Sequence, residues 1–330
     1  MSSHIAEGLK SKYPDSRLLW LAEPHVGGLL ANNPFVDKVV IFNKQLYKKL
    51  WSSKKYLHLI LEVFRFIKAL RAENINIVFD VQGLLRTRVI AWLTGARSRY
   101  GFNSKEPGKF LLTNILTKSS LGTRMGNEYY EMLEQIGASC VGLKQKVYED
   151  TKSQRDTQSF LMMRGICKPY IVLAPFTTRP QKHWTDEGWK IVARNLYELH
   201  SFEIIWLGGE NDRSNAQRLA KESVGVSLAG DTNLMSASII IGGAVALIGV
   251  DTGLTHIGSA YGTPTVAIFG STCPYTDGNS AKTIVLYSNL VCSPCRRKPI
   301  CGQQYDCMVS IAPENVISNL MRLLHTETKS

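Results

Sequence analysis

The chain has 330 residues, of which 39 are Lys or Arg and 27 are Asp or Glu, so its formal net charge is +12. With 44% hydrophobic and 20% charged residues, the composition is that of an ordinary globular protein and excludes a collagen-like, coiled-coil or mostly disordered chain. The length is typical of two domains of about 150 residues each. The basic excess favours an anionic partner, which could be a phosphorylated small molecule, an acidic lipid or a nucleic acid.

The beginning of the chain does not have the pattern of a signal peptide. Glu7, Lys10 and Lys12 lie where a signal peptide would require an apolar core. No stretch reaches the roughly 18 apolar residues that a membrane span requires. We therefore expect a cytoplasmic protein.

Short apolar or β-branched runs predict three strands in the first half, at Arg17–Ala22, Lys38–Phe42 and Asn76–Phe79. A helix is predicted over Leu57–Arg71, between the last two strands. The chain opens in a helix-like segment, Ser2–Tyr13, although a nucleotide-binding α/β domain normally opens in a buried strand. We therefore expect the first strand of this sheet to be missing.

The second half has a clearer alternation of strands and helices. Thr185 can cap a helix whose first turn carries two acidic residues, and Trp189, Val192, Leu196 and Leu199 form a core-facing stripe along it. Apolar runs predict strands at Tyr170–Ala174, Glu203–Leu207, Val245–Val250, Thr265–Phe269 and Thr283–Tyr287. This alternation indicates an α/β fold with parallel sheets.

The polar stretch Tyr148–Ser159 is the best candidate for a domain boundary. It divides the chain into an N-terminal domain, residues 1–150, and a C-terminal domain, residues 151–330. A final helix is predicted over Pro313–Leu324, with Pro near its start, and could pack back on the N-terminal domain.

Seven cysteines, an odd number, argue against a framework of disulfides in a chain without a signal peptide. Four of them form a C-x2-C-x5-C-x5-C run that could hold zinc or an iron–sulfur cluster: Cys292, Cys295, Cys301 and Cys307. The spacing is not a common metal-binding one, so reduced structural thiols are the favoured interpretation.

The segment Leu247–Ser271 carries the strongest chemical signal. A predicted strand ends at Asp251, and Thr252 and Gly253 then lead into a probable helix that contains His256. In an open α/β sheet, ligands bind where strands end and helices begin, because free N–H groups and the helix dipole favour a phosphate. Asp251 could accept hydrogen bonds from a hydroxyl-rich ligand, or it could merely cap the helix.

Two further strand ends carry polar side chains. Thr177, Thr178, Arg179 and Lys182 share the loop after Ala174 and suit a diphosphate, although the loop could be only a solvated basic turn. Glu210 follows Leu207-Gly208-Gly209 and could accept hydrogen bonds from a ribose or cap the next helix. The three strand ends together predict a site for a phosphorylated nucleotide. No G-x-G-x-x-G turn or P-loop motif is present, which disfavours a dinucleotide-dependent hydride-transfer enzyme and a P-loop enzyme.

Several segments resemble glycosyltransferase family nine, the ADP-heptose:lipopolysaccharide heptosyltransferases. The run VDTGLTHIGSAYGTPTVAIFGST is similar to the signature of that family, and APFTTRPQKHW is similar to its donor diphosphate loop and closest to the heptosyltransferase I branch. In the first half, the segments Phe79–Leu84 (FDVQGL) and Asn103–Pro107 (NSKEP) resemble a D-x-Q-G-L and an (R/K)-E-P element. The cysteine run also resembles one found in a subset of relatives.

The resemblance implies a B-type glycosyltransferase fold, in which two Rossmann-like domains face each other across a cleft. It also implies an inverting reaction that moves heptose from ADP-heptose to the lipopolysaccharide inner core, with no protein-bound metal or other cofactor. The donor-binding residues that it implies are Thr177, Thr178, Lys182, Glu210, Thr232, Asp251, Thr252, Gly253 and His256. Arg86 and Lys105 would bind the acidic Kdo or heptose acceptor, which is linked to lipid A.

The family's catalytic base is an aspartate in an S-x-G-D loop after the first strand. Counting back from Tyr13, that aspartate would fall ahead of Met1, and His4 is a poor substitute because it lies inside the predicted helix. We therefore expect this chain to bind nucleotide better than it transfers sugar.

Two other classes of protein compete with this interpretation. One is a nucleotide-sugar-binding protein without transfer activity. The other is a nucleic-acid-binding protein, which is disfavoured because no nucleic-acid module is recognisable and the lysines are spread along the chain. The lipid-linked acceptor and the basic charge favour peripheral association with the inner face of the inner membrane.

Overall fold

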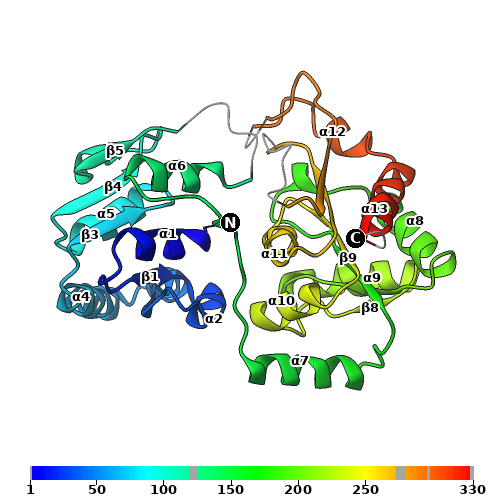
Figure 1. The fold of residues 1–330 in the computed structure, drawn as a ribbon, viewed down its shortest axis with the longest axis horizontal. Coiled ribbons are helices and arrows are strands. Elements are labelled where there is room, and N and C mark those ends of the chain that lie inside the picture. Colours follow the sequence, from blue (N-terminus) through cyan, green and yellow to red (C-terminus); the bar gives the residue numbers. More distant parts are fainter. Residues whose placement is uncertain (1, 119–124, 273–279, 296–297, 328–330) are drawn as a thin grey trace.

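The computed structural model describes residues 2–118, 125–272, 280–295 and 298–327. Figure 1 shows two lobes side by side, the first built from the beginning of the chain and the second from its later part. Three sheets form, and every strand pairing in them is parallel. The first two sheets use only residues before 150 and the third uses only residues after it. These findings confirm the α/β class with parallel sheets.

The elements of the first lobe follow one another in short alternating segments. They are α1 (His4–Lys12), β1 (Leu19–Ala22), α2 (Pro24–Ala31), β2 (Lys38–Ile41), α3 (Lys44–Ser52), α4 (Tyr56–Ala72), β3 (Ile77–Asp80), α5 (Leu85–Leu93), β4 (Ser98–Phe102), the 3-10 turn η1 (Lys109–Leu111), β5 (Asn114–Leu116) and α6 (Asn127–Gln135). The three strands predicted here are confirmed, and β4 and β5 were not predicted.

The sheet of the first lobe is interrupted. β1 pairs with β2, and β3 pairs with β4, which pairs with β5, but β1 and β3 belong to separate sheets among the described residues. A cavity of about 520 Å³ lies between the two parts, and its apolar lining includes Trp20 of β1, Phe79 of β3 and Ile5 of α1. As expected, the segment Ser2–Tyr13 forms a helix, α1, and its residue Ile5 lies beside the gap between β1 and β3.

The second lobe is built on one six-stranded sheet in the order β11-β10-β9-β6-β7-β8. Its elements are α7 (Thr151–Met163), β6 (Tyr170–Ala174), η2 (Pro180–Lys182), α8 (Asp186–Glu198), β7 (Glu203–Trp206), η3 (Glu210–Asp212), α9 (Arg213–Glu222), β8 (Val226–Ser227), α10 (Leu234–Gly242), β9 (Ala246–Val250), α11 (Gly253–Tyr261), β10 (Thr265–Phe269), β11 (Thr283–Tyr287), α12 (Asp306–Val309) and α13 (Pro313–Glu327). The five strands predicted here are confirmed, and β8 was not predicted.

Helices cover both faces of the large sheet. Residues of α8, α9 and α13 share one core with the side chains on one face, and residues of α10 and α11 share a second core with the other face. Because both faces are covered, every residue of the central strands β6, β9 and β10 is buried. Central parallel strands that are covered on both faces have this continuous apolar composition.

Helix α13 corrects one expectation. Its residues Val316, Leu320 and Leu323 are buried in the core that α8 and β10 share, so the helix completes the second lobe and does not pack back on the first. The reason is that this stripe matches the apolar face of α8. The stripe predicted for α8 ends one turn early, because Leu199 caps the helix and is 70% exposed.

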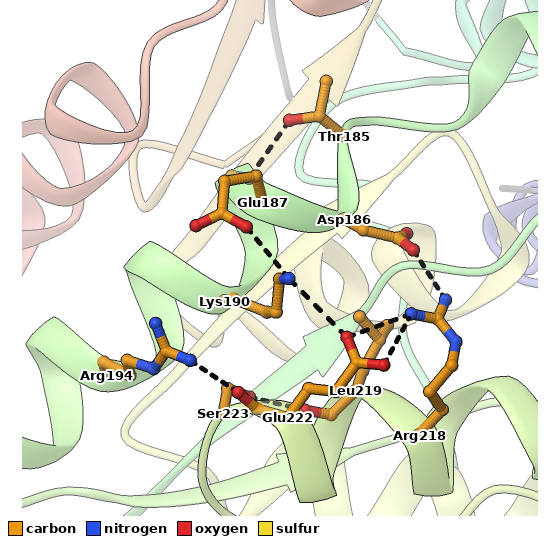
Figure 2. Close-up of polar contacts among 10 residues, drawn as sticks. Thr185, Asp186, Glu187, Lys190, Arg194, Arg218, Leu219, Glu222 and Ser223 are labelled. Atoms are coloured by element: carbon orange, nitrogen blue, oxygen red, sulfur yellow. Dashed lines mark hydrogen bonds and ion pairs between the residues drawn. The ribbon is translucent and has the colours of Figure 1, made fainter.

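The α8–α9 pair is also joined by polar contacts on its outer side (Figure 2). Arg218 Nη2 of α9 lies 2.6 Å from Asp186 Oδ2 of α8, and Lys190 Nζ of α8 lies 3.6 Å from Glu222 Oε2 of α9. As predicted, Thr185 caps α8, because its hydroxyl accepts a hydrogen bond from the Gly188 N–H. These exposed pairs hold the first turn of α8, which follows the loop after β6.

Contacts between the lobes come from few elements. Helix α2 packs against α10, and the Tyr261 hydroxyl of α11 donates to Glu149. At the boundary, Asn32 Nδ2 donates a 3.1 Å hydrogen bond to Oδ2 of Asp150, the residue that caps α7. Met125 packs against Ala267 and Phe269 of β10. These contacts place the first lobe beside the edge of the second that carries α10 and α11.

Candidate functional site

The order of the large sheet reverses between β6 and β9. From β6 the chain moves outward through β7 and β8, and it then returns to β9 on the other side of β6 before moving through β10 and β11. At such a switch point the loops after the two strands run in opposite directions and leave a crevice for a ligand. The loops after β6 and β9 are the two that the sequence analysis singled out first.

The loop after β6 holds the predicted diphosphate-binding residues. Thr177 and Arg179 are partly exposed and Thr178 is exposed. Within the described part of the chain, neither the two threonine hydroxyls nor the Arg179 guanidinium makes a hydrogen bond or ion pair, whereas the Thr177 carbonyl accepts a 2.9 Å hydrogen bond from His183 Nε2. The loop is thus fixed through its backbone, and its side chains remain available to a ligand.

Lys182 joins this loop to the end of β9. Its ammonium lies 2.5 Å from Asp251 Oδ2 and 3.4 Å from the Asp251 carbonyl. An ammonium has three N–H donors, so one remains for a further acceptor. The two side chains are only 16% and 17% exposed.

Asp251 is the centre of a larger group of polar side chains. The Thr272 hydroxyl, just after β10, also donates to Asp251 Oδ2, and His256 Nε2 lies 3.5 Å from Asp251 Oδ1. The structure therefore brings together Lys182, Asp251 and His256 as predicted, and it adds Thr272, which the sequence analysis did not single out. Its signals in the sequence are a hydroxyl group three positions after a predicted strand and its place at the end of the run VDTGLTHIGSAYGTPTVAIFGST.

Electrostatics fix the charge of this group. Burial alone would raise the pKa of Asp251, but hydrogen bonds from His256, Lys182 and Thr272 outweigh it and hold that pKa well below its usual range. Burial lowers the pKa of His256, although Asp251 opposes this. Asp251 is therefore ionised at neutral pH, and the His256 imidazole is held toward its neutral form.

The first turn of α11 is open toward this site. The Thr252 hydroxyl accepts a 3.2 Å hydrogen bond from the Leu254 N–H and so caps the helix. A Cβ placed on Gly253 would meet no atom within 4 Å. An anion can therefore approach the helix N-terminus, where free N–H groups and the dipole favour it. Thr252, and not Asp251, is the helix cap.

Glu210 and Thr232 lie at the ends of β7 and β8. Glu210 is exposed and forms a 3.0 Å ion pair with Arg213, which also pairs with Asp231, next to Thr232. A Cβ on Gly230, where φ is +76°, would lie 2.7 Å from Glu210 Oε2, so the carboxylate lies against this turn. The structure thus brings Glu210 and Thr232 to one edge of the second lobe. Glu210 does not cap α9, because the N-cap residue of that helix is Asp212, whose carboxylate accepts the Gly209 N–H at 2.9 Å.

The predicted acceptor residues lie in the first lobe. Arg86 is 40% exposed and lies 4.0 Å from Glu23, so residues just after β1 and β3 approach each other. Lys105 is exposed in the loop after β4. Asp80 ends β3, and its buried Oδ1 accepts the N–H groups of Gln82 and Gly83, which fixes the turn before α5.

Arg88 is a residue that the sequence analysis missed. It is fully buried in α5 and donates hydrogen bonds to the carbonyls of Phe102, Glu106 and Pro107 and to the Ser104 hydroxyl. One side chain therefore holds the whole loop that presents Lys105. The sequence carries little signal for it, because an arginine on a short helix is usually exposed.

His4 is not placed for catalysis. It lies in α1, as expected, is 1% exposed and stacks on Tyr130 at 4.0 Å between ring centroids. The aspartate base that the resemblance implies was expected ahead of Met1 and so lies outside the described residues.

The cysteine run packs close to the donor-side loops. Cys307 is buried, and a Cβ on Gly270, just after β10, would lie 2.8 Å from its sulfur. Burial raises the pKa of Cys295 and Cys307, and the neighbouring thiols of the run add to the effect. The four cysteines carry no disulfide, and no group of three or more His, Cys, Asp or Glu residues in the described ranges is arranged to hold a metal ion.

Comparison with known proteins gives a consistent family. The model of "Glycosyltransferase family 9 (heptosyltransferase)" matches residues 63–305. Lipopolysaccharide heptosyltransferase 1 of Pseudomonas aeruginosa is 25% identical over 94% of this chain and 90% of its own length. Lipopolysaccharide heptosyltransferase 1 of Escherichia coli K12 is 25% identical over 82% and 83%, and heptosyltransferase 3 of the same strain is 24% identical over 82% and 79%.

Solved structures share the fold. A family 9 glycosyltransferase from Veillonella parvula superposes with a TM-score of 0.83 at 21% identity and covers 98% of this chain and 93% of that one. The E. coli heptosyltransferase WaaC with ADP superposes with a TM-score of 0.71 at 20% identity and covers 97% and 95%. The match confirms the B-type glycosyltransferase fold, and the family model covers most of this sequence. The chain belongs to glycosyltransferase family 9, the heptosyltransferases, and is an enzyme of that family.

Proposed function

We propose that this enzyme transfers heptose from ADP-heptose to the inner core of lipopolysaccharide, with inversion at the anomeric carbon. The observation that carries the proposal is the group at the β6–β9 switch point, where Lys182, Asp251 and Thr272 meet beside unengaged threonine hydroxyls and the open N-terminus of α11. A nucleoside diphosphate sugar offers matching chemistry, since its diphosphate needs cations and N–H donors and its sugar needs hydroxyl partners.

The donor residues have separate roles in this proposal. Thr177, Thr178, Thr252 and the backbone at Gly253 bind the diphosphate, with Lys182 as its cation. Asp251, kept ionised by its partners, accepts hydrogen bonds from heptose hydroxyls, and His256 holds the carboxylate from the other side. Glu210 accepts from the ribose, and the backbone at Thr232 borders the adenine.

The reaction is a single displacement. The acceptor hydroxyl forms a bond to the anomeric carbon while the bond from that carbon to the diphosphate oxygen breaks, and a carboxylate base takes the hydroxyl proton. ADP leaves with the bonding electron pair. The negative charge that grows on it is stabilised by Lys182 and the α11 N–H groups, so the proposal assigns no metal ion or other cofactor to this step.

The acceptor side follows the same chemistry. Kdo and core phosphates are anionic, and Arg86 and Lys105 supply cations on the first lobe. The lipid A-linked acceptor places the enzyme at a membrane surface, and we propose the inner face of the inner membrane. The specific step is proposed as that of heptosyltransferase 1, because the TTR…KHW form of the loop after β6 resembles that branch.

A transfer assay tests the proposal. The enzyme is incubated with ADP-heptose and Kdo-bearing lipid A, and the acceptor is examined by mass spectrometry for the mass gain of one heptose. A gain on this acceptor supports the assignment to the first heptose transfer of the core. A gain seen only on an acceptor that already carries heptose would assign the enzyme to a later transfer. ADP that binds in calorimetry without any transfer, also by a chain extended ahead of Met1, supports a nucleotide-sugar-binding protein instead.

A further inference from the structure

Helices α3 and α4 carry an apolar surface that points away from the protein core. The exposed fractions are 81% for Leu57, 64% for Ile60 and 64% for Phe64. These residues follow the i, i+3, i+7 spacing of one helix face. Together with neighbouring exposed side chains they form what we call the α3–α4 face: Trp51, Tyr56, Leu57, Ile60, Leu61 and Phe64.

The opposite side of α4 already faces the core. Leu70 is 5% exposed, and Phe66 packs on Phe42 with ring centroids 5.4 Å apart. The helix is therefore apolar on both sides. Such a helix is normally buried all round, and Figure 1 shows α4 on the outer side of the first lobe, away from the second.

Aromatic residues mark the junction of the two helices. Trp51, in the last turn of α3, meets Tyr56, at the start of α4, edge to face at 5.5 Å between ring centroids. Both side chains are exposed, by 64% and 48%. Trp and Tyr are enriched where an apolar phase meets water, because each carries an apolar ring and one polar group.

The same segment concentrates positive charge. Residues 44–72 contain eight Lys or Arg and one acidic residue, Glu62, in a chain of net charge +12. Glu62 is neutralised by Arg65 at 2.6 Å, whereas Lys48, Lys49, Lys54 and Lys55 make no ion pair with any described residue.

Charge decides between the occupants that such a surface could have. A second copy of the chain, packed by two-fold symmetry, would bring two sets of these lysines together, and like charges at an interface are repulsive. An anionic bilayer satisfies both features, because apolar side chains enter the headgroup boundary while lysines extend to the lipid phosphates.

The helix is suited to lie on a bilayer and not to cross it. No helix among the described residues is long and apolar enough to span a membrane, and α4 carries Glu62, Arg65, Lys68 and Arg71 within 17 residues. We propose that the α3–α4 face is a docking surface for an anionic lipid bilayer, on which α4 lies in the plane of the headgroups with Leu57, Ile60 and Phe64 inserted. This deepens the proposed function and rests on it only for the lipid-linked acceptor.

Vesicle flotation tests the docking surface. The purified protein is mixed with neutral phosphatidylcholine vesicles or with vesicles that contain about 30% phosphatidylglycerol. We expect the wild type to float with the anionic vesicles only and to be released by high salt. The variant Leu57→Ser/Ile60→Ser/Phe64→Ser should bind about tenfold more weakly or worse, and Lys48→Glu/Lys49→Glu/Lys54→Glu/Lys55→Glu should lose the preference for anionic lipid. Leu199→Ser, an exposed leucine of the second lobe, is the matched control and should bind like the wild type.

Two further measurements keep the interpretation unambiguous. ADP binding by each variant shows that it is folded, and transfer to a delipidated, soluble acceptor reports the activity without any membrane. Retained transfer by a variant that no longer floats supports the docking surface. Absence of transfer by the wild type, and also by a chain extended ahead of Met1, contradicts the proposed function and leaves the docking surface untouched. Equal flotation of the triple serine variant and the wild type would overturn the docking surface, as would a stable dimer in sedimentation that the serine substitutions break.

Discussion

The ammonium of Lys182 lies 2.5 Å from the carboxylate of Asp251, so the loop after β6 is tied to the residue that follows β9. The two residues are 69 positions apart in the sequence and meet because β6 and β9 are neighbours at the reversal of strand order. A diphosphate that enters this crevice meets a lysine already held in place.

Replacing Lys182 tests the leaving-group role. In Lys182→Met we expect kcat/KM for ADP-heptose to fall about a hundredfold, because the cation that faces the departing diphosphate is lost. We also expect about 2 kcal/mol of destabilisation, because Asp251 would be left mostly buried without its cation. The measurements are steady-state kinetics and urea unfolding.

The double variant Lys182→Met/Asp251→Asn separates the two effects, because it restores stability but not turnover. Lys190→Met is the matched control, since Lys190 forms exposed ion pairs on the outer side of α8 and α9 (Figure 2) and its loss should leave kcat/KM unchanged. Wild-type turnover in Lys182→Met would contradict the assigned role.

Asp251 predicts a specific pH dependence of stability. Its pKa is lower in the folded protein than the value of about 3.9 in an unfolded chain, so its contribution is fully present above about pH 5 and is lost as the pH falls through the folded pKa. The difference in unfolding free energy between the wild type and Asp251→Asn should be constant from pH 5 to 8 and should shrink below about pH 4. Urea unfolding over this range measures it, and a difference that grows on acidification would exclude the assignment.

His256 predicts a change at higher pH. Burial lowers its pKa in the folded state, so below the unfolded value of about 6.5 the unfolded chain binds the proton more readily and stability decreases. In His256→Gln we expect the decrease between pH 7 and pH 5 to be smaller than in the wild type. Identical slopes in the wild type and His256→Gln would show that burial does not lower the pKa of His256.

Parts of this fold and site were readable from the sequence because they depend on local composition. The strands Tyr170–Ala174 and Thr265–Phe269 are apolar throughout and lie in the middle of the sheet, where both faces are covered. Strand β4 was missed because it contains Arg99, whose guanidinium is satisfied by the Leu111 carbonyl at 2.6 Å, and Gly101. The donor-side loops were each predicted separately, from polar residues that follow the end of a predicted strand.

Other parts depend on contacts between distant segments. The sequence places Asp251, Thr272 and Lys182 at three different strand ends, and only the strand order brings them to one carboxylate. Arg88 could not be singled out, because its four partners lie 14 to 19 residues away, at the end of β4 and in the loop that follows it. The apolar outer face of α4 was missed because periodicity reports that a helix has an apolar stripe and not whether anything covers it.

Arg88 should act on the acceptor side alone. In Arg88→Met the loop that carries Lys105 loses the hydrogen bonds that hold it, and the buried carbonyls lose their donor. We expect KM for the acceptor to rise about tenfold while ADP affinity stays within twofold of the wild type. Kinetics with each substrate varied in turn measure this, and Arg88→Lys should recover part of the loss because a cationic donor is kept.

The control for this experiment is Leu85→Ala, an exposed position on the same helix. An equal loss of ADP affinity and acceptor KM in Arg88→Met would show that the arginine supports the whole fold and not the acceptor loop.

The interrupted sheet of the first lobe gives the last prediction. Among the described strands, β1 and β3 each leave one edge unpaired beside the cavity of about 520 Å³, which Ile5 and Leu9 of α1 also line. A strand that leads into α1 would form a strand–helix–strand unit with β1. With the usual right-handed crossover of such a unit, that strand would lie in this gap. An extension ahead of Met1 that ends in about five alternating Val, Ile and Leu residues should therefore pair with both edges and fill the cavity.

We expect this extension to raise Tm by several degrees, because it buries apolar surface and satisfies backbone groups on two strands. It should also reduce the fluorescence of an apolar dye such as ANS, which binds exposed apolar cavities. An extension of equal length made of Gly and Ser is the control and should change neither quantity, because it offers no apolar side chains to the cavity. The same Tm and dye fluorescence with both extensions would mean that the gap between Trp20 and Phe79 does not accept a strand.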